Sequence, residues 1–146
     1  MYLLDTNIVS ADAPTKRHVS VDAFAVWMRA NSDRLYLSAI TIAEIEAGIA
    51  RAARIGATTK AEHLRRWLAA VEHFYAGRIL PFGIEEARHA GLMLDRARAD
   101  DPGFEDIAIA ATAVAHGLTV LTANERHFEA LGVPLANPLK QLPIVQ

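Results

Sequence analysis

The sequence of 146 residues contains no cysteine, which excludes a disulfide framework and a thiolate metal site. No apolar run approaches the roughly 18 residues of a membrane-spanning helix. The N-terminus also lacks the charged segment, apolar stretch and cleavage site of a secretory signal. These absences lead us to expect a cytoplasmic protein that makes no contact with a membrane.

Neither sign of charge is in large excess. The chain has 15 basic and 17 acidic residues, so its formal net charge is -2 with the six histidines counted as neutral. A large nucleic-acid surface built from side-chain charge alone is not expected at this balance. One stretch, residues 51–66, is clearly basic and holds a single acid, Glu62. Its arginines are Arg51, Arg54, Arg65 and Arg66. The stretch is either a solvated face or the place where phosphates or an acidic partner approach.

What the sequence does contain is typical of a globular protein, with 52% hydrophobic and 22% charged residues. The length predicts one domain, residues 1–146, of which 137–146 form a C-terminal tail. Short apolar strands alternate with amphipathic helices along the whole chain. The predicted strands are 2–4, 35–37, 78–80, 118–121 and 133–136, and the main helices begin near 20, 41, 59, 84, 106 and 125. This alternation predicts an α/β fold in which helices flank both faces of a parallel sheet.

Polar residues stand where the predicted strands end. Asp5 directly follows the first strand, and Asn124 follows the fourth. Glu44 and Asp106 each lie in the first turn of a predicted helix. All four can converge at one edge of a parallel sheet, where ligands bind in such folds. Clustered carboxylates repel one another unless a cation is present, and their oxygens suit Mg²⁺ or Mn²⁺.

Each of these residues also has a purely structural explanation. Asp5 can cap the next helix, and Glu44 can be the partner of Thr41 in a capping box. Asp106 can complement a helix dipole, and Asn124 can be a turn residue. Taken singly, these roles explain Glu44 and Asn124 best. The placement of all four residues at one edge favours a functional site.

The same segments resemble the successive motifs of PIN-domain ribonucleases, in particular the VapC toxins of the FitB-like subgroup. The resemblance covers nearly the whole chain in order. It lies in residues 2–7, 36–44 with Gly48, 76–82, 106–111, and 122–124 with Phe128. It implies a single PIN-like domain with a parallel sheet of about five strands.

The resemblance also implies RNA cleavage that depends on Mg²⁺ or Mn²⁺, with Asp5, Glu44 and Asp106 as catalytic metal ligands. Thr6, Thr122 and Asn124 stand where assisting residues are expected. The family often has a fourth acid at the position of Asn124, and an amide adds no charge there. We therefore expect one tight metal site and a weaker second one. The neighbouring Glu125 is expected to point elsewhere.

The partners implied by the resemblance are an RNA substrate, a second copy of the chain and a small DNA-binding antitoxin. The antitoxin would cover the active-site groove, for which helices 20–31 and 41–53 are the candidates. Operator DNA would be bound only through the antitoxin.

Two other functions stay open at this stage. A PIN-like binding module with weakened or lost catalysis is motivated by Asn124. A phosphatase with Asp5 as nucleophile would need a second acid two residues on, where the chain has Asn7, and a well-placed lysine.

Overall fold

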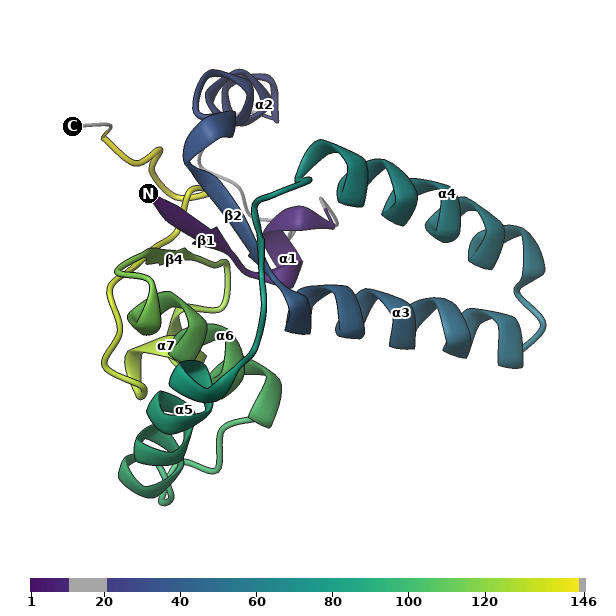
Figure 1. Cartoon of the computed structure of the whole chain (residues 1–146). Coiled ribbons are helices and arrows are strands. Elements are labelled where there is room, and N and C mark those ends of the chain that lie inside the picture. Colours follow the sequence, from purple (N-terminus) through teal and green to yellow (C-terminus); the bar gives the residue numbers. More distant parts are fainter. Residues whose placement is uncertain (11–20, 145–146) are drawn as a thin grey trace.

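The computed structural model describes residues 1–10 and 21–144 (Figure 1). Within these residues five parallel strands form one sheet in the order β3-β2-β1-β4-β5. The strands are β1 (Tyr2–Leu4), β2 (Leu35–Ser38), β3 (Ile79–Leu80), β4 (Thr119–Leu121) and β5 (Leu135–Ala136). The predicted α/β fold with a parallel sheet of about five strands is confirmed. Because β1 is central, the residue that follows it is held between two hydrogen-bonded neighbours.

The helices agree with the sequence pattern to within a few residues, except for one short helix that it missed. The missed helix is α1 (Thr6–Val9), directly after β1. The others are α2 (Val21–Ala30), α3 (Ala39–Arg54), α4 (Thr58–Phe74), α5 (Ile84–Arg96), α6 (Phe104–Ala115) and α7 (Glu125–Glu129), with a 3₁₀ turn at Ser32–Arg34. None of the helices in the described part of the chain is long and apolar enough to cross a membrane.

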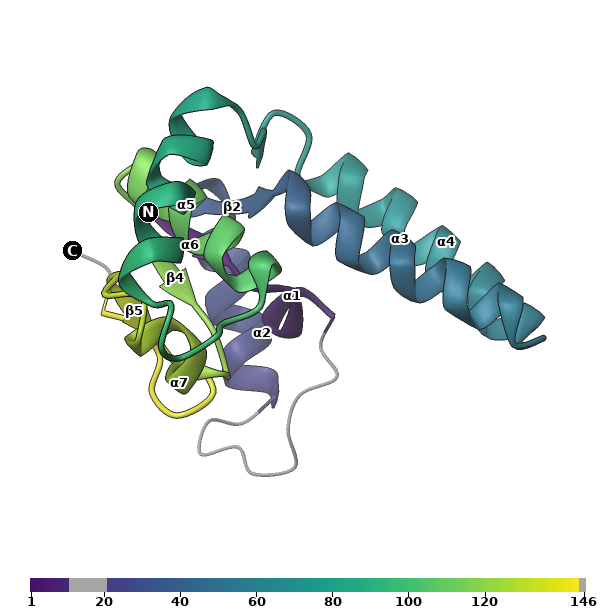
Figure 2. The same ribbon diagram turned by 90° about the horizontal axis from the view of Figure 1, so that it is seen from below.

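Helices cover both faces of the sheet, as the alternation predicted (Figure 2). Successive residues of a strand point to opposite faces, so each strand contributes to two cores. Leu3 and Val120 pack with α5, α6 and α7, whereas Leu4 and Leu121 pack with α2 and the end of α4. Burial on both faces explains why the strand sequences are continuously apolar.

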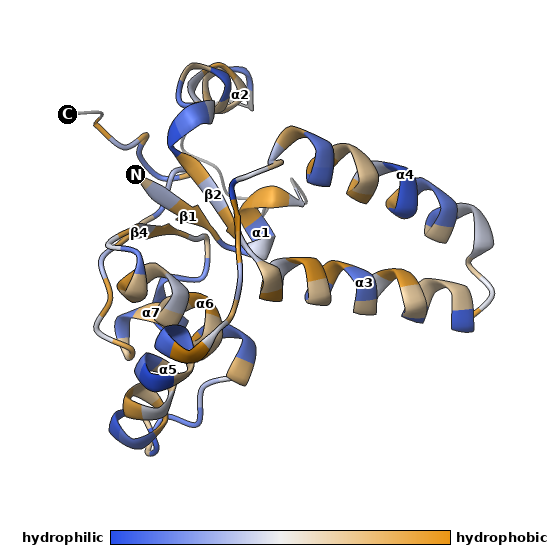
Figure 3. Ribbon diagram, viewed as in Figure 1, coloured by the Kyte–Doolittle hydropathy of each residue, from blue (hydrophilic) through white to orange (hydrophobic). Residues whose placement is uncertain are grey.

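The helices α3 and α4 form a hairpin that projects from the sheet (Figure 1). The hairpin has a small core of its own, made by Ile45, Ile49, Ala52, Ala61 and Leu68. Polar residues alternate with this apolar stripe along both helices (Figure 3). The stripe gives each helix one inward face and leaves the other faces to solvent.

The start of α3 differs from the prediction. The N-cap is Ser38, whose side chain accepts a hydrogen bond from the backbone N–H of Ile40. Thr41 is fully buried in the first turn, and its hydroxyl has no hydrogen-bond partner in the described chain. The predicted capping box of Thr41 and Glu44 is therefore wrong. The physical reason is that α3 begins directly after β2, so the last strand residue occupies the cap position.

Candidate active site

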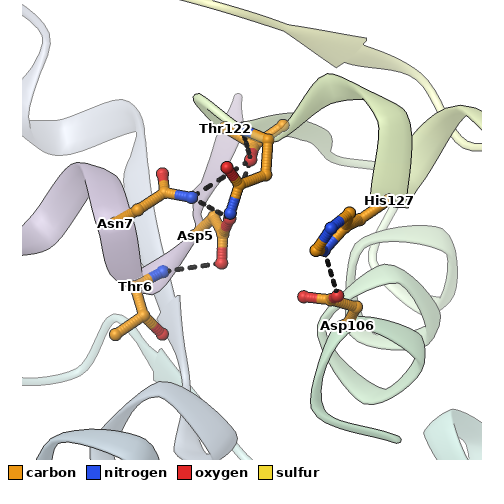
Figure 4. Close-up of polar contacts among 7 residues, drawn as sticks. Asp5, Thr6, Asn7, Asp106, Thr122 and His127 are labelled. Carbon is orange, nitrogen blue, oxygen red and sulfur yellow. Dashed lines mark hydrogen bonds and ion pairs between the residues drawn. The ribbon is translucent and has the colours of Figure 1, made fainter. Parts of the chain in front are cut away.

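Asp5 is held rigidly at the carboxyl end of β1. Its side chain is buried, and Oδ1 accepts the backbone N–H of Thr6 at 2.8 Å. Oδ2 accepts the Asn7 amide and the Thr122 hydroxyl, each at 2.7 Å. These contacts, drawn in Figure 4, fix both oxygens of the carboxylate. Asp5 also serves as the N-cap of α1, so the capping role and a role in a site coincide.

Asn7 joins the ends of two neighbouring strands. Its amide nitrogen donates to Asp5, and its carbonyl oxygen accepts the backbone N–H of Ala123 at 3.1 Å. Asn7 was part of the motif noted in the sequence, but no role was assigned to it there. Its position two residues after Asp5 was the available signal.

Glu44 belongs to α3, and its side chain contacts Thr6, the residue that follows Asp5. It lies one turn into α3 and is half-buried. The hydroxyl of Thr6 donates a hydrogen bond to Glu44 Oε2. Thr6 therefore contacts two of the predicted acidic residues, one through its backbone and one through its side chain.

Asp106 lies in the first turn of α6, as predicted. Its Oδ2 is 2.8 Å from Nδ1 of His127, a residue of α7 that the sequence did not single out (Figure 4). His127 follows Asn124 by three residues, one helical turn, and this spacing was the only signal in the sequence.

The charges of the three carboxylates act on one another. Burial raises the pKa of Asp5 above its ordinary value, hydrogen bonds from Thr122, Thr6 and Asn7 oppose the rise, and the charge of Asp106 adds to it. Burial likewise raises the pKa of Glu44, the hydrogen bond from Thr6 opposes it, and the charges of Asp5, Asp106 and Glu105 add to it. The three carboxylates thus share one region of mutual repulsion.

This arrangement suits a hard divalent cation by its chemistry. The donors are carboxylate oxygens whose repulsion a bound cation would relieve. No three histidine, aspartate or glutamate side chains of the described residues are arranged to hold a metal ion as they stand.

The end of β4 supplies the remaining predicted residues. Thr122 is buried, donates to Asp5 and accepts the backbone N–H of Asn124 at 2.9 Å. The Asn124 side chain is exposed and makes no capping bond to α7. Glu125 points elsewhere, as expected, because its carboxylate accepts hydrogen bonds from Lys140 and Asn137.

The four predicted basic residues all lie on the α3–α4 hairpin and are exposed. They are Arg51, Arg54, Arg65 and Arg66. Arg51 also borders a hollow of about 430 Å³ between the two helices. The described contacts tie none of the four to the carboxylates, so a role in RNA binding stays a prediction.

Comparison with known proteins shows a consistent family relationship. The family model described as "PIN domain" matches residues 2–133. A VapC ribonuclease of Sinorhizobium fredii is 36% identical over 141 residues, covering 94% of this chain and 97% of that protein. The toxin FitB of Neisseria gonorrhoeae is 36% identical over 146 residues, covering 94% of this chain and 98% of that protein.

A solved structure, FitAB bound to a DNA fragment, has a similar fold. Its matching chain superposes with a TM-score of 0.70 at 30% sequence identity, covering all of this chain and 99% of that chain. The similarity extends through the sheet, both helical layers and the hairpin.

Proposed function

The chain belongs to the PIN-domain family, and we propose that it is a metal-dependent ribonuclease acting as the toxin of a type II toxin–antitoxin pair. One observation carries the proposal: the buried Asp5 carboxylate accepts three hydrogen bonds at the carboxyl end of β1, and the adjacent Thr6 donates a hydrogen bond to Glu44. The names of the related ribonuclease and toxin support it.

The proposed ligands of Mg²⁺ or Mn²⁺ are Asp5, Glu44 and Asp106. When bound, such an ion lowers the pKa of a coordinated water and neutralises charge on the scissile phosphate. The chain's own part is to hold the ligands. Asn7, Thr122 and the backbone of Thr6 fix Asp5, and the Thr6 hydroxyl fixes Glu44. Rigid placement of this kind keeps the entropic cost of assembling the site low.

Asn124 shapes the proposed metal stoichiometry. With three acids and one exposed amide, the site offers one negative charge fewer than a site with four acids. We propose one tight ion and a second, weaker one that fills when the RNA phosphate adds negative oxygens.

The proposed partners are RNA, a second copy of the chain and a small DNA-binding antitoxin. The related FitAB structure with DNA supports binding of operator DNA through the antitoxin. Exposed apolar side chains on α5, Ile84 and Leu92, support a self-associating surface. The helices α2 and α3 are the proposed walls of the groove that the antitoxin covers. We propose the cytoplasm as the site of action, because the RNA substrate is found there.

The direct test is cleavage of single-stranded RNA by the purified chain. We expect cleavage with Mg²⁺ or Mn²⁺, none with a chelator, and none for Asp5→Asn at any metal concentration. Co-purification with the product of an adjacent upstream gene tests the antitoxin. An intact RNA after incubation with the metal-loaded wild type would reject the nuclease proposal.

A binding module without catalysis is the second candidate, and the exposed amide of Asn124 is the observation that favours it. Titration of Mn²⁺ separates the two, because an inactive module should bind the ion poorly. The phosphatase alternative loses support, because Asn7 donates a hydrogen bond to Asp5 where that chemistry needs an acid.

A further inference from the structure

We propose that His127 is a positioning residue that holds the Asp106 carboxylate in the orientation required for metal binding. This inference rests on the proposed ribonuclease function. It is carried by the contact between Nδ1 of His127 and Oδ2 of Asp106 at 2.8 Å. A carboxylate can only accept, so Nδ1 carries the hydrogen and the ring is fixed as the donor.

The three acids of the site differ in how they are held. Asp5 has donors from Thr6, Asn7 and Thr122, and Glu44 has the hydroxyl of Thr6. Across the described ranges 1–10 and 21–144, the contacts of Asp106 include one side-chain donor, His127. Asp106 therefore depends on a single group for its orientation.

Packing anchors the backbone that carries His127, although its side chain is 57% exposed. Phe128, the next residue of α7, is fully buried in the core that also contains Ile107 and Ala110 of α6. The two helices are thereby anchored against each other beside the site. From this anchored backbone His127 orients the Asp106 carboxylate through one hydrogen bond, as outer partners of metal-binding carboxylates do.

Without His127, Asp106 has room to turn away. Asp106 and His127 both border a hollow of about 300 Å³, which is also lined by Asp100, Asp101 and Gly103. The Asp106 side chain is 21% exposed, so water can solvate it in that hollow. A solvated carboxylate that samples several rotamers loses affinity for a cation because ordering it costs entropy.

The test is calorimetric titration of Mn²⁺ into the full chain. His127→Ala should weaken Mn²⁺ binding by roughly 10- to 100-fold, the usual effect of losing an outer partner of a ligand. His127→Asn should restore most of the affinity, because the Asn amide nitrogen takes the position of Nδ1. His127→Gln places its amide nitrogen nearer the position of Nε2 and should not rescue.

A matched control exists in another part of the chain. Nε2 of His116 lies 2.8 Å from Oε1 of Glu86, a pair of the same length between α5 and the end of α6. His116→Ala should leave Mn²⁺ affinity unchanged. In an Asp106→Asn background, His127→Ala should cause no further loss, because its effect passes through Asp106.

Each result has one meaning. A folded His127→Ala variant that binds Mn²⁺ like the wild type overturns the inference, and so does a folded His127→Asn variant that binds as weakly as His127→Ala. Thermal unfolding establishes the folded state in each case. A wild type that binds no Mn²⁺ overturns the proposed function itself. A wild type that binds Mn²⁺ while His127→Ala has no effect overturns only the role of His127.

Discussion

The hydroxyl of Thr6 donates a hydrogen bond to the carboxylate of Glu44, across 38 positions of the sequence. Thr6 opens α1 directly after Asp5, and Glu44 lies one turn into α3. The contact joins Glu44 to the first residue of α1, next to the end of β1. Glu44 therefore faces the candidate site, and Ser38 performs the capping that the sequence pattern had attributed to Thr41 and Glu44.

Glu44→Gln separates charge from hydrogen bonding. The amide oxygen can still accept from Thr6, so the contact survives while the charge that repels Asp5 and Asp106 is removed. We expect a melting temperature close to that of the wild type and Mn²⁺ affinity reduced by at least about tenfold, since a carboxylate ligand is replaced by a neutral one. Thermal unfolding and calorimetry measure the two effects. A variant that binds Mn²⁺ and cleaves RNA normally would remove Glu44 from the site.

Removing either of two hydroxyl groups near the start of α3, those of Ser38 and Thr41, should have opposite effects on stability. Ser38→Ala removes the cap on the Ile40 N–H and should destabilise by about 1 kcal/mol. Thr41→Val keeps the shape of a buried side chain whose hydroxyl has no partner in the described chain, and should stabilise by about 1 kcal/mol. Chemical denaturation of both variants is the measurement. Destabilisation by Thr41→Val would mean that the hydroxyl has a role not visible in its contacts.

Asn124→Asp adds the fourth acid that the proposed site lacks. The side chain is exposed and makes no capping bond, so the change should leave folding intact. An added charge close to a bound cation should tighten Mn²⁺ binding by on the order of tenfold and lower the metal concentration needed for cleavage. Asn124→Ala should reduce cleavage less than Asp5→Asn does. Two equally tight ions in the wild type, or no gain on Asn124→Asp, would contradict an influence of position 124 on the metal site.

The basic face of the hairpin is tested by the salt dependence of RNA binding. Replacing Arg51, Arg54, Arg65 and Arg66 with Gln should flatten the dependence of log Kd on log salt. The slope should fall by roughly 0.7 for each phosphate of a single strand that the protein no longer neutralises. The charge-matched control replaces Arg29, Arg88, Arg96 and Arg98, which are exposed on α2, on α5 and just after α5. An equal change of slope in both quadruple variants would indicate general charge attraction without a specific hairpin contact.

Glu86 should make stability depend on pH. Burial raises its pKa, but backbone N–H groups, including that of Gly83, and His116 outweigh this and hold the pKa below the ordinary 4.5. A carboxyl group with a lowered folded pKa stabilises the fold above pH 4.5 and loses that contribution as the pH falls through its folded value. Glu86→Gln should therefore be less stable than the wild type at pH 7, with the difference shrinking below pH 4.5. A difference in free energy of unfolding that stays constant from pH 7 to pH 3 would contradict this.

The sequence by itself determined the layering of the fold and the edge of the sheet at which Asp5 lies. Continuous apolar strands such as 2–4 require burial on both faces, and the alternating helices provide it. Asp5 could be placed at the end of β1 and Asp106 in the first turn of α6, because a strand end and a helix start follow from local chemistry.

Only the tertiary structure decided which side chains meet at that edge. The contacts of Thr6 with Glu44, of Thr122 with Asp5 and of His127 with Asp106 join elements that are 21 to 117 positions apart in the sequence. Such pairs depend on strand order and helix packing, which no local pattern encodes. The cap of α3 was missed for a related reason: Ser38 is both the last residue of β2 and the first polar group available to α3, and its role follows from how closely the two elements join.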